Sequence, residues 1–350
     1  MKLTTAFPGG NLRAVYGLGD RIAVAPELRS TQTDWFYWAF GVEGAAGRTL
    51  TFDFSPKKWL GPFGPAVSRD LRHWEWLGSG TPASFTYTFP DDAPVYFAHD
   101  LLYPVSRIGE LASELGQTVQ TLCTSERGRA IPFFRFGEGA RSIVLTARHH
   151  ACESSGSYVL EGVLRELYAA PIPGYEVFCV PAVDYDGAAD GDQGKNRFPH
   201  DHNRDYLPEP LYPGVRGVKD YLTSHRVAYA FDFHSPWHYG GENDYVNIVR
   251  REKIPAAHYE RFAALFESSL VPGAMPFWAK DFIPPDTGWN SGDSTRIAFG
   301  GFAQSLPAIE LAFTLETPYF GTADAPASQE SLVLLGRSFA RALRRYIEEA

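Results

Sequence analysis

Two stretches in the first hundred residues alternate hydrophobic and polar positions, which is the pattern of a β-strand with one buried face. In residues 48–54 (RTLTFDF) the side chains at positions 50, 52 and 54 share one face, and residues 83–89 (ASFTYTF) repeat the pattern. An aromatic-rich stretch at 34–41 (DWFYWAFG) ends in glycine, and clusters of Pro, Gly, Asp and Ser separate the three stretches. Short strands divided by turn residues predict an antiparallel β-sandwich.

The pattern changes after about residue 118, where apolar strands begin to alternate with helical periodicity. Strands are predicted at 131–136, 142–147, 175–180, 227–234 and 309–316, and helices at 153–168, 215–224, 256–270 and 328–348. Strands that alternate with helices predict a mixed, largely parallel sheet that is covered by helices.

A short predicted helix separates the two patterns. Ser106 is a candidate N-cap, hydrophobic residues follow at helical spacing, and Gly116 can end the helix. We therefore predict an N-terminal antiparallel β-sandwich domain over residues 1–115 and an α/β domain over residues 116–350. A chain of 350 residues is long enough for two hydrophobic cores.

Composition narrows the partners and the compartment. The formal net charge is −9, from 41 acidic and 32 basic residues. Such a surface repels phosphate backbones, so nucleic acid is not an expected partner. Three cysteines (Cys123, Cys152 and Cys179) are too few for a disulfide framework, which favours a reducing cytoplasm. No apolar stretch reaches the length of a signal-peptide core or a membrane span, so we expect a cytoplasmic protein without membrane contact and leave its oligomeric state open.

Candidate metal chemistry begins where the predicted strand 142–147 ends. His149, His150 and Glu153 follow the strand, and a helical pattern starts at once. Because His150 and Glu153 are three positions apart, one turn of backbone can direct both at one point. Imidazole nitrogen and carboxylate oxygen are zinc ligands. On this pair alone, the alternative is that the histidines are loop residues and Glu153 is a solvated helix cap.

Two further predicted strands end on residues that can do metal chemistry, His234 and Glu316. The carboxyl ends of parallel strands lie along one edge of a sheet and share a crevice. Two histidines and one glutamate with an open fourth position form a catalytic zinc set. In that arrangement Glu316 is a carboxylate beside the metal.

The long loop between the first two strand ends carries Arg197, Asn203 and Arg204. Guanidinium groups present the forked donors that a carboxylate or an oxyanion needs. The alternative is a solvated charged loop with internal Asp–Arg pairs.

The motifs occur in the order of a known family. The chain reads ARHHACE at 147–153, DYDG at 184–187, KNR at 195–197, DHNRDY at 201–206, DFHS at 232–235 and TLE at 314–316. It thereby resembles the M14 zinc carboxypeptidases, specifically the cytosolic carboxypeptidase branch, whose motifs are ARxHPGE, NPDG, GNxR, DLNRxW, DLHGH and TLE. The N-terminal part is similar to the β-sandwich domain of that branch. The resemblance implies a phosphorylase/hydrolase-like α/β fold for the second domain.

The resemblance also implies roles for particular residues. One zinc ion per chain would be held by His150, Glu153 and His234. Glu316 would be the general base and then the proton donor. Arg197 would polarise the scissile carbonyl, and Asn203 with Arg204 would bind the terminal carboxylate of a peptide or peptide-like substrate. Arg296, in GDSTR at 292–296, could contact an acidic substrate side chain or form a surface pair.

The chain departs from the family motifs at several positions. Ala151 and Cys152 replace Pro-Gly in the ligand turn, and Cys152 is a rival ligand that fits the motif less well than Glu153. The segment from Arg197 to Asn203 is shorter than in the family, which bears on the direction of the Arg197 side chain. Three further histidines are expected to be loop structure rather than a second metal site, and the alternative for the third is contact with substrate: His200, His202 and His238.

We therefore predict a zinc metallocarboxypeptidase that hydrolyses a C-terminal or isopeptide-type amide next to a free carboxylate, with Glu316 as the base for a zinc-activated water. One alternative is a zinc-dependent deacylase of N-acyl amino acids, against which the sandwich domain argues. Another is a non-catalytic peptide-binding protein, against which the complete set of key side chains argues.

Overall fold

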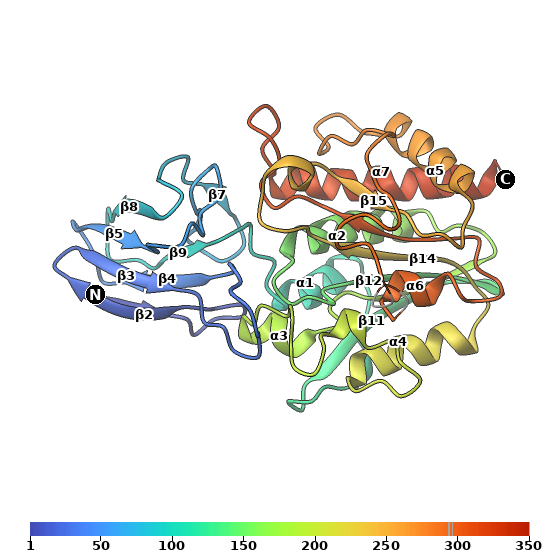
Figure 1. Ribbon diagram of the computed structural model, residues 1–350, viewed down its shortest axis with the longest axis horizontal. Helices are drawn as coiled ribbons and strands as arrows, with labels where there is room; N and C mark the ends of the chain where they lie inside the picture. Colours follow the sequence, from blue (N-terminus) through green and yellow to red (C-terminus); the bar gives the residue numbers. More distant parts are fainter. Residues whose placement is uncertain (293–294, 296, 350) are drawn as a thin grey trace.

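The computed structural model describes residues 1–292, 295 and 297–349 (Figure 1). The predicted Arg296 therefore lies outside the described residues. No helix in these ranges is both long and apolar enough to cross a membrane. Among the described residues, nine strands before residue 115 form two sheets, and eight strands after it form a third. We retain residue 115 as the proposed boundary between the two parts.

The two N-terminal sheets pack face to face. One has the order β1 (Lys2–Thr4), β4 (Ala39–Glu43), β9 (Val95–Ala98), β6 (Ala66–Ser68) and β7 (Glu75–Trp76). The other has the order β2 (Arg13–Leu18), β3 (Arg21–Ala25), β5 (Thr49–Asp53) and β8 (Ser84–Thr88). All pairs are antiparallel except β3 with β5, which run parallel.

Aromatic side chains fill the space between the two sheets. Phe40 and Phe97 of the first sheet contact Phe52 and Phe85 of the second, with ring centroids 5.0 to 6.5 Å apart. The predicted alternation is confirmed, because Leu50 and Phe52 are buried while positions 49, 51 and 53 are not. The aromatic stretch at 34–41 differs from its prediction, since strand β4 begins only at Ala39 and residues 35–38 form a loop, buried from Phe36 onward.

The larger sheet has the order β10-β11-β13-β12-β14-β17-β15-β16. Its strands are β10 (Gln120–Thr124), β11 (Ala130–Gly137), β12 (Arg141–Ala147), β13 (Tyr175–Val180), β14 (Val227–His234), β15 (Asn247–Val249), β16 (Phe282–Ile283) and β17 (Leu311–Glu316). The central strands β13, β12, β14 and β17 are parallel, while β11 and β15 pair antiparallel to them. The mixed, largely parallel sheet is therefore confirmed.

Helices cover the sheet on both sides. They are α1 (Ser106–Glu114), α2 (Ser154–Ala169), α3 (Tyr185–Asp190), α4 (Pro213–Ser224), α5 (Ala256–Ser268), α6 (Phe299–Ala303) and α7 (Gln329–Glu348), with 3-10 turns at His202–Arg204 and Gly241–Asp244. Helices α5 and α7 lie on one side of the sheet and α4 on the other (Figure 1). The apolar strands are buried on both faces, as all eight residues of β14 show.

Two features of the fold bring the ends of β12, β14 and β17 together. The strands are in parallel register, with Ala147 opposite Phe233 and His234 opposite Glu316. Helix α2 starts directly against the end of β14, because a Cβ at Gly156 would lie 2.6 Å from the carbonyl oxygen of Phe233. The carboxyl ends of the three strands therefore share one edge, at the place where open α/β sheets bind their ligands.

Candidate metal centre

Three side chains from two strand ends meet in a buried cluster. His150 and Glu153 follow β12, and His234 is the last residue of β14. The Nδ1 atoms of His150 and His234 are 3.1 Å apart. The carboxylate of Glu153 contacts both, with Oε1 3.0 Å from His150 Nδ1 and Oε2 2.7 Å from His234 Nδ1. All three residues are at most 6% exposed.

This cluster, His150, Glu153 and His234, fits a divalent metal ion such as zinc. Their ligand atoms all lie within 4.8 Å of one another. Ligands on a tetrahedral zinc with bonds of about 2.0–2.1 Å are about 3.3 Å apart, close to the separations seen here. Burial opposes ionisation of Glu153, but the charges of Lys195 and the two histidines hold its pKa well below its usual range. The cluster therefore offers an anion and two imidazole nitrogens to one cation.

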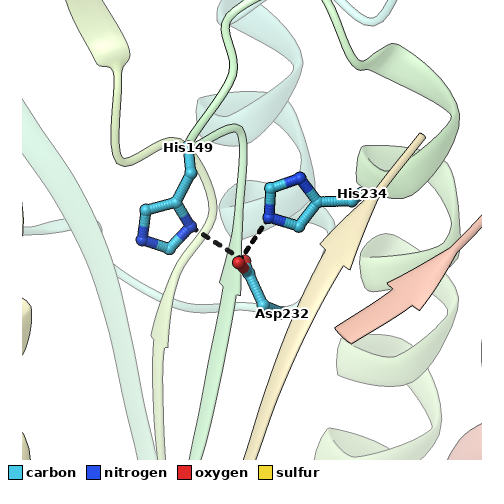
Figure 2. Close-up of side chains that lie close together, drawn as sticks. All are labelled: His149, Asp232 and His234. Atoms are coloured by element: carbon cyan, nitrogen blue, oxygen red, sulfur yellow. Dashed lines mark hydrogen bonds and ion pairs between the residues drawn. The ribbon is translucent and has the colours of Figure 1, made fainter. Parts of the chain in front are cut away.

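A second carboxylate orients His234 from behind. Asp232 lies between two imidazoles (Figure 2): its Oδ2 is 2.5 Å from His234 Nε2 and its Oδ1 is 2.9 Å from His149 Nδ1. With Nε2–H donated to Asp232, the Nδ1 lone pair of His234 is free for the metal. His149 in turn is 2.8 Å from the hydroxyl of Tyr206. His149, Asp232 and His234 could also group around a cation. Because their distances are those of hydrogen bonds, we assign His149 and Asp232 to orienting the ligand His234.

Glu316 is placed beside the cluster by strand pairing, since it lies opposite His234 in the register of β14 and β17. Its side chain is buried, and its Oε2 has no hydrogen-bond partner among the residues that the structure describes. Burial raises the pKa of Glu316, against the charge of His234. A buried carboxylate with a free oxygen is suited to accept a proton.

The loop residues predicted to bind substrate are distributed around the cluster. Arg197 Nη2 donates to Asp184 Oδ2 at 2.6 Å and lies 3.4 Å from Asp192 Oδ2, so two carboxylates hold this guanidinium. Asn203 is close to His234, with 3.5 Å between Nδ2 and Nε2, and its Oδ1 accepts the backbone N–H of Phe299. The structure thus brings Asn203 to the ligands and directs Arg197 toward the loop's own acids.

Two cations near the cluster had no sequence prediction. Lys195 places its Nζ 2.6 Å from Glu153 Oε1, and although burial opposes it, the carboxylates of Glu153 and Glu316 raise its pKa. Arg251, which follows β15, lies close enough to Arg204 and Glu316 to be affected by their charges. Burial and then Arg204 lower its pKa to about 10. The KNR motif contained Lys195, but the family motif has Asn there, and no local signal marks Arg251.

The remaining candidates have structural contacts. His200 pairs with Asp205 at 2.7 Å, and His202 stacks on Tyr212 with centroids 3.8 Å apart. His238 stacks on His99 within an aromatic cluster. Cys152 is buried with its Sγ 3.7 Å from the hydroxyl of Tyr319, and among the described residues it belongs to neither group of side chains that could hold a metal ion.

Comparison with known proteins shows which sequences this chain is similar to. No protein-family model matches the chain. An uncharacterized protein of Zymomonas mobilis subsp. mobilis is 27% identical over 259 residues, covering 67% of this chain and 67% of that protein. Cytosolic carboxypeptidase 2 of Xenopus tropicalis is 29% identical over 182 residues, which cover 43% of this chain and only 19% of that longer protein.

Solved structures align over the whole chain. The metallo-carboxypeptidase of Burkholderia cenocepacia has a TM-score of 0.82 at 18% identity, covering 99% of both chains. The metallo-carboxypeptidase of Pseudomonas aeruginosa, in complex with (2-guanidinoethylmercapto)succinic acid, has a TM-score of 0.80 at 20% identity, covering 100% of both chains. At this identity the likeness establishes the fold, which is that of the M14 metallo-carboxypeptidases. The predicted fold class and the resemblance are thereby confirmed.

Proposed function

We propose that the protein is a zinc carboxypeptidase that hydrolyses a C-terminal or isopeptide-type amide bond next to a free carboxylate. The observation that carries this proposal is the cluster of His150, Glu153 and His234, whose metal-binding atoms face one another while Glu316 stands beside them with a free oxygen. A metal and a separate carboxylate are the two groups that amide hydrolysis by water requires. The carboxypeptidase fold supports the same conclusion.

The reaction divides between the metal and this chain's own side chains. When bound, zinc supplies a Lewis acid that activates water at neutral pH. Glu316 accepts the proton of the attacking water and then delivers it to the leaving amine. Its burial keeps bulk water from competing for that proton, and Asp232 keeps His234 in the tautomer that the site needs.

A carboxylate of the substrate would be bound by the guanidinium of Arg204, next to Asn203. Arg204 Nη1 donates to the backbone carbonyl oxygen of Asn203 at 3.0 Å, which restricts the guanidinium of Arg204. Arg251 adds a second, half-buried guanidinium near Glu316. The Pseudomonas aeruginosa neighbour was solved with a succinic acid derivative, which supports recognition of carboxylates by this fold. Arg197 keeps its proposed role toward the scissile carbonyl, provided that substrate draws it from Asp184.

The test is a digest of a peptide library by protein purified without added metal, with cleavage read by mass spectrometry and metal content measured in parallel. We expect one zinc per chain and stepwise loss of single residues from free C-termini. Peptides with an amidated C-terminus should resist, because they lack the carboxylate that Arg204 binds. Zinc below about half an ion per chain after a gentle preparation would contradict the metal site.

A panel of N-acyl amino acids in the same assay tests the deacylase alternative. Such compounds also present an amide next to a carboxylate, so the metal chemistry does not separate the two functions. Turnover of acyl amino acids with no release of residues from peptides would replace the peptidase proposal with that alternative.

A further inference from the structure

We propose that Lys195 is a positioning residue for the metal ligand Glu153, and that the N-terminal segment 31–37 holds Lys195 in place. The inference rests on the proposed metal site. It assigns the N-terminal part of the chain a direct role in building that site.

The contact itself is a short ion pair in a protected place. Lys195 Nζ lies 2.6 Å from Glu153 Oε1, and the lysine side chain is only 17% exposed. Glu153 Oε2 lies on the side of His234, 2.7 Å from its Nδ1. The two oxygens of one carboxylate therefore have different neighbours: Oε1 faces the ammonium and, at 3.0 Å, Nδ1 of His150, whereas Oε2 faces Nδ1 of His234. A ligand carboxylate held in this way has one orientation toward the metal.

Segment 31–37 holds the loop that carries Lys195. The hydroxyl of Thr31 donates to the carbonyl oxygen of Lys195 at 3.1 Å, and the N–H of Gln32 donates to the carbonyl oxygen of Asn196 at 3.1 Å. Asn196 Nδ2 returns a bond to the hydroxyl of Thr33 at 2.9 Å. The ring of Trp35 lies over the ammonium, with its centroid 5.5 Å from Nζ. A cation over an indole ring is attracted to it and loses rotational freedom there.

The other end of this loop is fixed between the N-terminal segment and the ligand turn. Gln193 makes two bonds to the backbone of Tyr37, accepting from its N–H at 2.9 Å and donating to its carbonyl at 2.8 Å. Gly194 has a φ of +75°, and a Cβ there would lie 2.1 Å from the backbone nitrogen of Ala151, in the turn between His150 and Glu153. The loop therefore contacts segment 31–37 on one side and the metal-ligand turn on the other.

Lys195 matches Asp232 in what it does for a ligand. Asp232 fixes the imidazole of His234 through Nε2, and Lys195 fixes the carboxylate of Glu153 through Oε1. Loss of such outer partners typically weakens metal binding 10- to 100-fold, because the ligand must be ordered by the metal alone. Lys195 also balances the negative charge that Glu153 and Glu316 place in one buried site.

The test compares Lys195→Met with wild type, with Lys195→Arg as the conservative variant and Lys58→Met, at an exposed lysine of the N-terminal part, as the control. Zinc affinity is measured by competition with a chelating dye, and ligand geometry by the visible spectrum of the Co²⁺-loaded protein. We expect Lys195→Met to bind zinc about 10- to 100-fold more weakly and to change the Co²⁺ spectrum. Lys195→Arg should recover part of the affinity, and Lys58→Met should match wild type.

Two results for Lys195→Met would overturn the inference. Unchanged zinc affinity with slower turnover would mean that the ammonium acts on the substrate, and tighter zinc binding would mean that it competes with the metal. Should Lys195→Met fail to fold, Trp35→Leu decides: weaker zinc binding supports the inference and unchanged binding overturns it. Absence of zinc from wild type would instead contradict the proposed function, so the two failures are distinguishable.

Discussion

The two-sheet N-terminal region and the strand-end edge of the larger sheet are both buried, yet they bury different chemistry. Within residues 1–98, Asn11 and Ser68 are the buried polar side chains among those that the structure describes. At the edge formed by β12, β14 and β17, buried carboxylates and imidazoles lie within hydrogen-bond distance of one another. Contacts between aromatic side chains hold the first region together, and contacts between charged side chains hold the second together.

The difference indicates which region of the fold carries the proposed chemistry. Burying an aromatic ring is favourable in itself, whereas a buried charge is costly unless it is paired. Burial of the carboxylates of Glu153, Asp232 and Glu316 therefore lowers the stability of the folded state. Partners such as His234 and Lys195 compensate part of this cost. Changes between the two sheets of the first region should alter stability alone, whereas changes at the strand-end edge, or in segment 31–37 that reaches it, should alter chemistry first.

The largest effect is expected from His234→Ala. The substitution removes one of the three proposed ligands and leaves Asp232 and Glu153 without the imidazole between them. Zinc content should fall close to zero and zinc-dependent turnover to background, both measured on the purified protein. His73→Ala, at a side chain that is 86% exposed, is the control and should keep both. A variant with full zinc content would remove His234 from the ligand set.

Glu316→Gln should separate metal binding from catalysis. The substitution keeps the shape of the side chain and removes its ability to take a proton, so kcat should fall about 10²- to 10⁴-fold while zinc stays bound. Glu310→Gln, at an exposed carboxylate just before the start of the same strand, is the matched control. Near-native turnover of Glu316→Gln would show that another group is the base.

Phe97→Ala tests the aromatic region. Phe97 is fully buried, and its ring lies 5.0 Å from that of Phe85 and 5.6 Å from that of Phe40. The cavity left behind should lower the free energy of unfolding by about 3–5 kcal/mol, measured by urea denaturation. Tyr16→Ala, at a side chain on β2 that is 68% exposed, should change it by less than about 0.5 kcal/mol. A weaker zinc affinity in folded Phe97→Ala would contradict the division between the regions.

The sequence predicts those features of the two regions that follow a recurring pattern along the chain. Leu50 and Phe52 mark a half-buried strand by alternation, and an apolar strand that ends on His234 or Glu316 marks a shared sheet edge. The loop at 35–38 was predicted as strand because its aromatic content is strand-like. Its residues are instead buried against the aromatic cluster around Phe36 and His99 and against Gln193, contacts that no local pattern encodes.

The residues that sequence reasoning missed act through distant contacts. Asp232 belongs to a motif that was recognised, but its bond to Nε2 of His234 depends on rotamers that appear only in three dimensions. Lys195 reaches Glu153 because segment 31–37 fixes its loop from more than 150 positions away. The shortened segment after Arg197 indicated that this side chain has a different direction than in the family. Only the structure shows that Arg197 pairs with Asp184.

The smallest predicted effect lies at the junction of the two regions, where Asp100 follows β9 and is affected by the charge of Arg148 after β12. Burial raises the pKa of Asp100 to about 7, although Arg148 opposes the shift. Because the unfolded value is about 3.9, the folded state holds this proton more tightly, and that contribution to stability is lost as the pH rises from about 4 to about 7.

Asp100→Asn cannot ionise and should avoid the loss. Its stability relative to wild type should therefore rise by about 1–3 kcal/mol between pH 5 and pH 8, measured by urea denaturation at both values. Asp324→Asn, at an exposed carboxylate, should show no such change. A difference between Asp100→Asn and wild type that stays constant or shrinks would mean that Asp100 is already ionised at pH 5 and is compensated by Arg148.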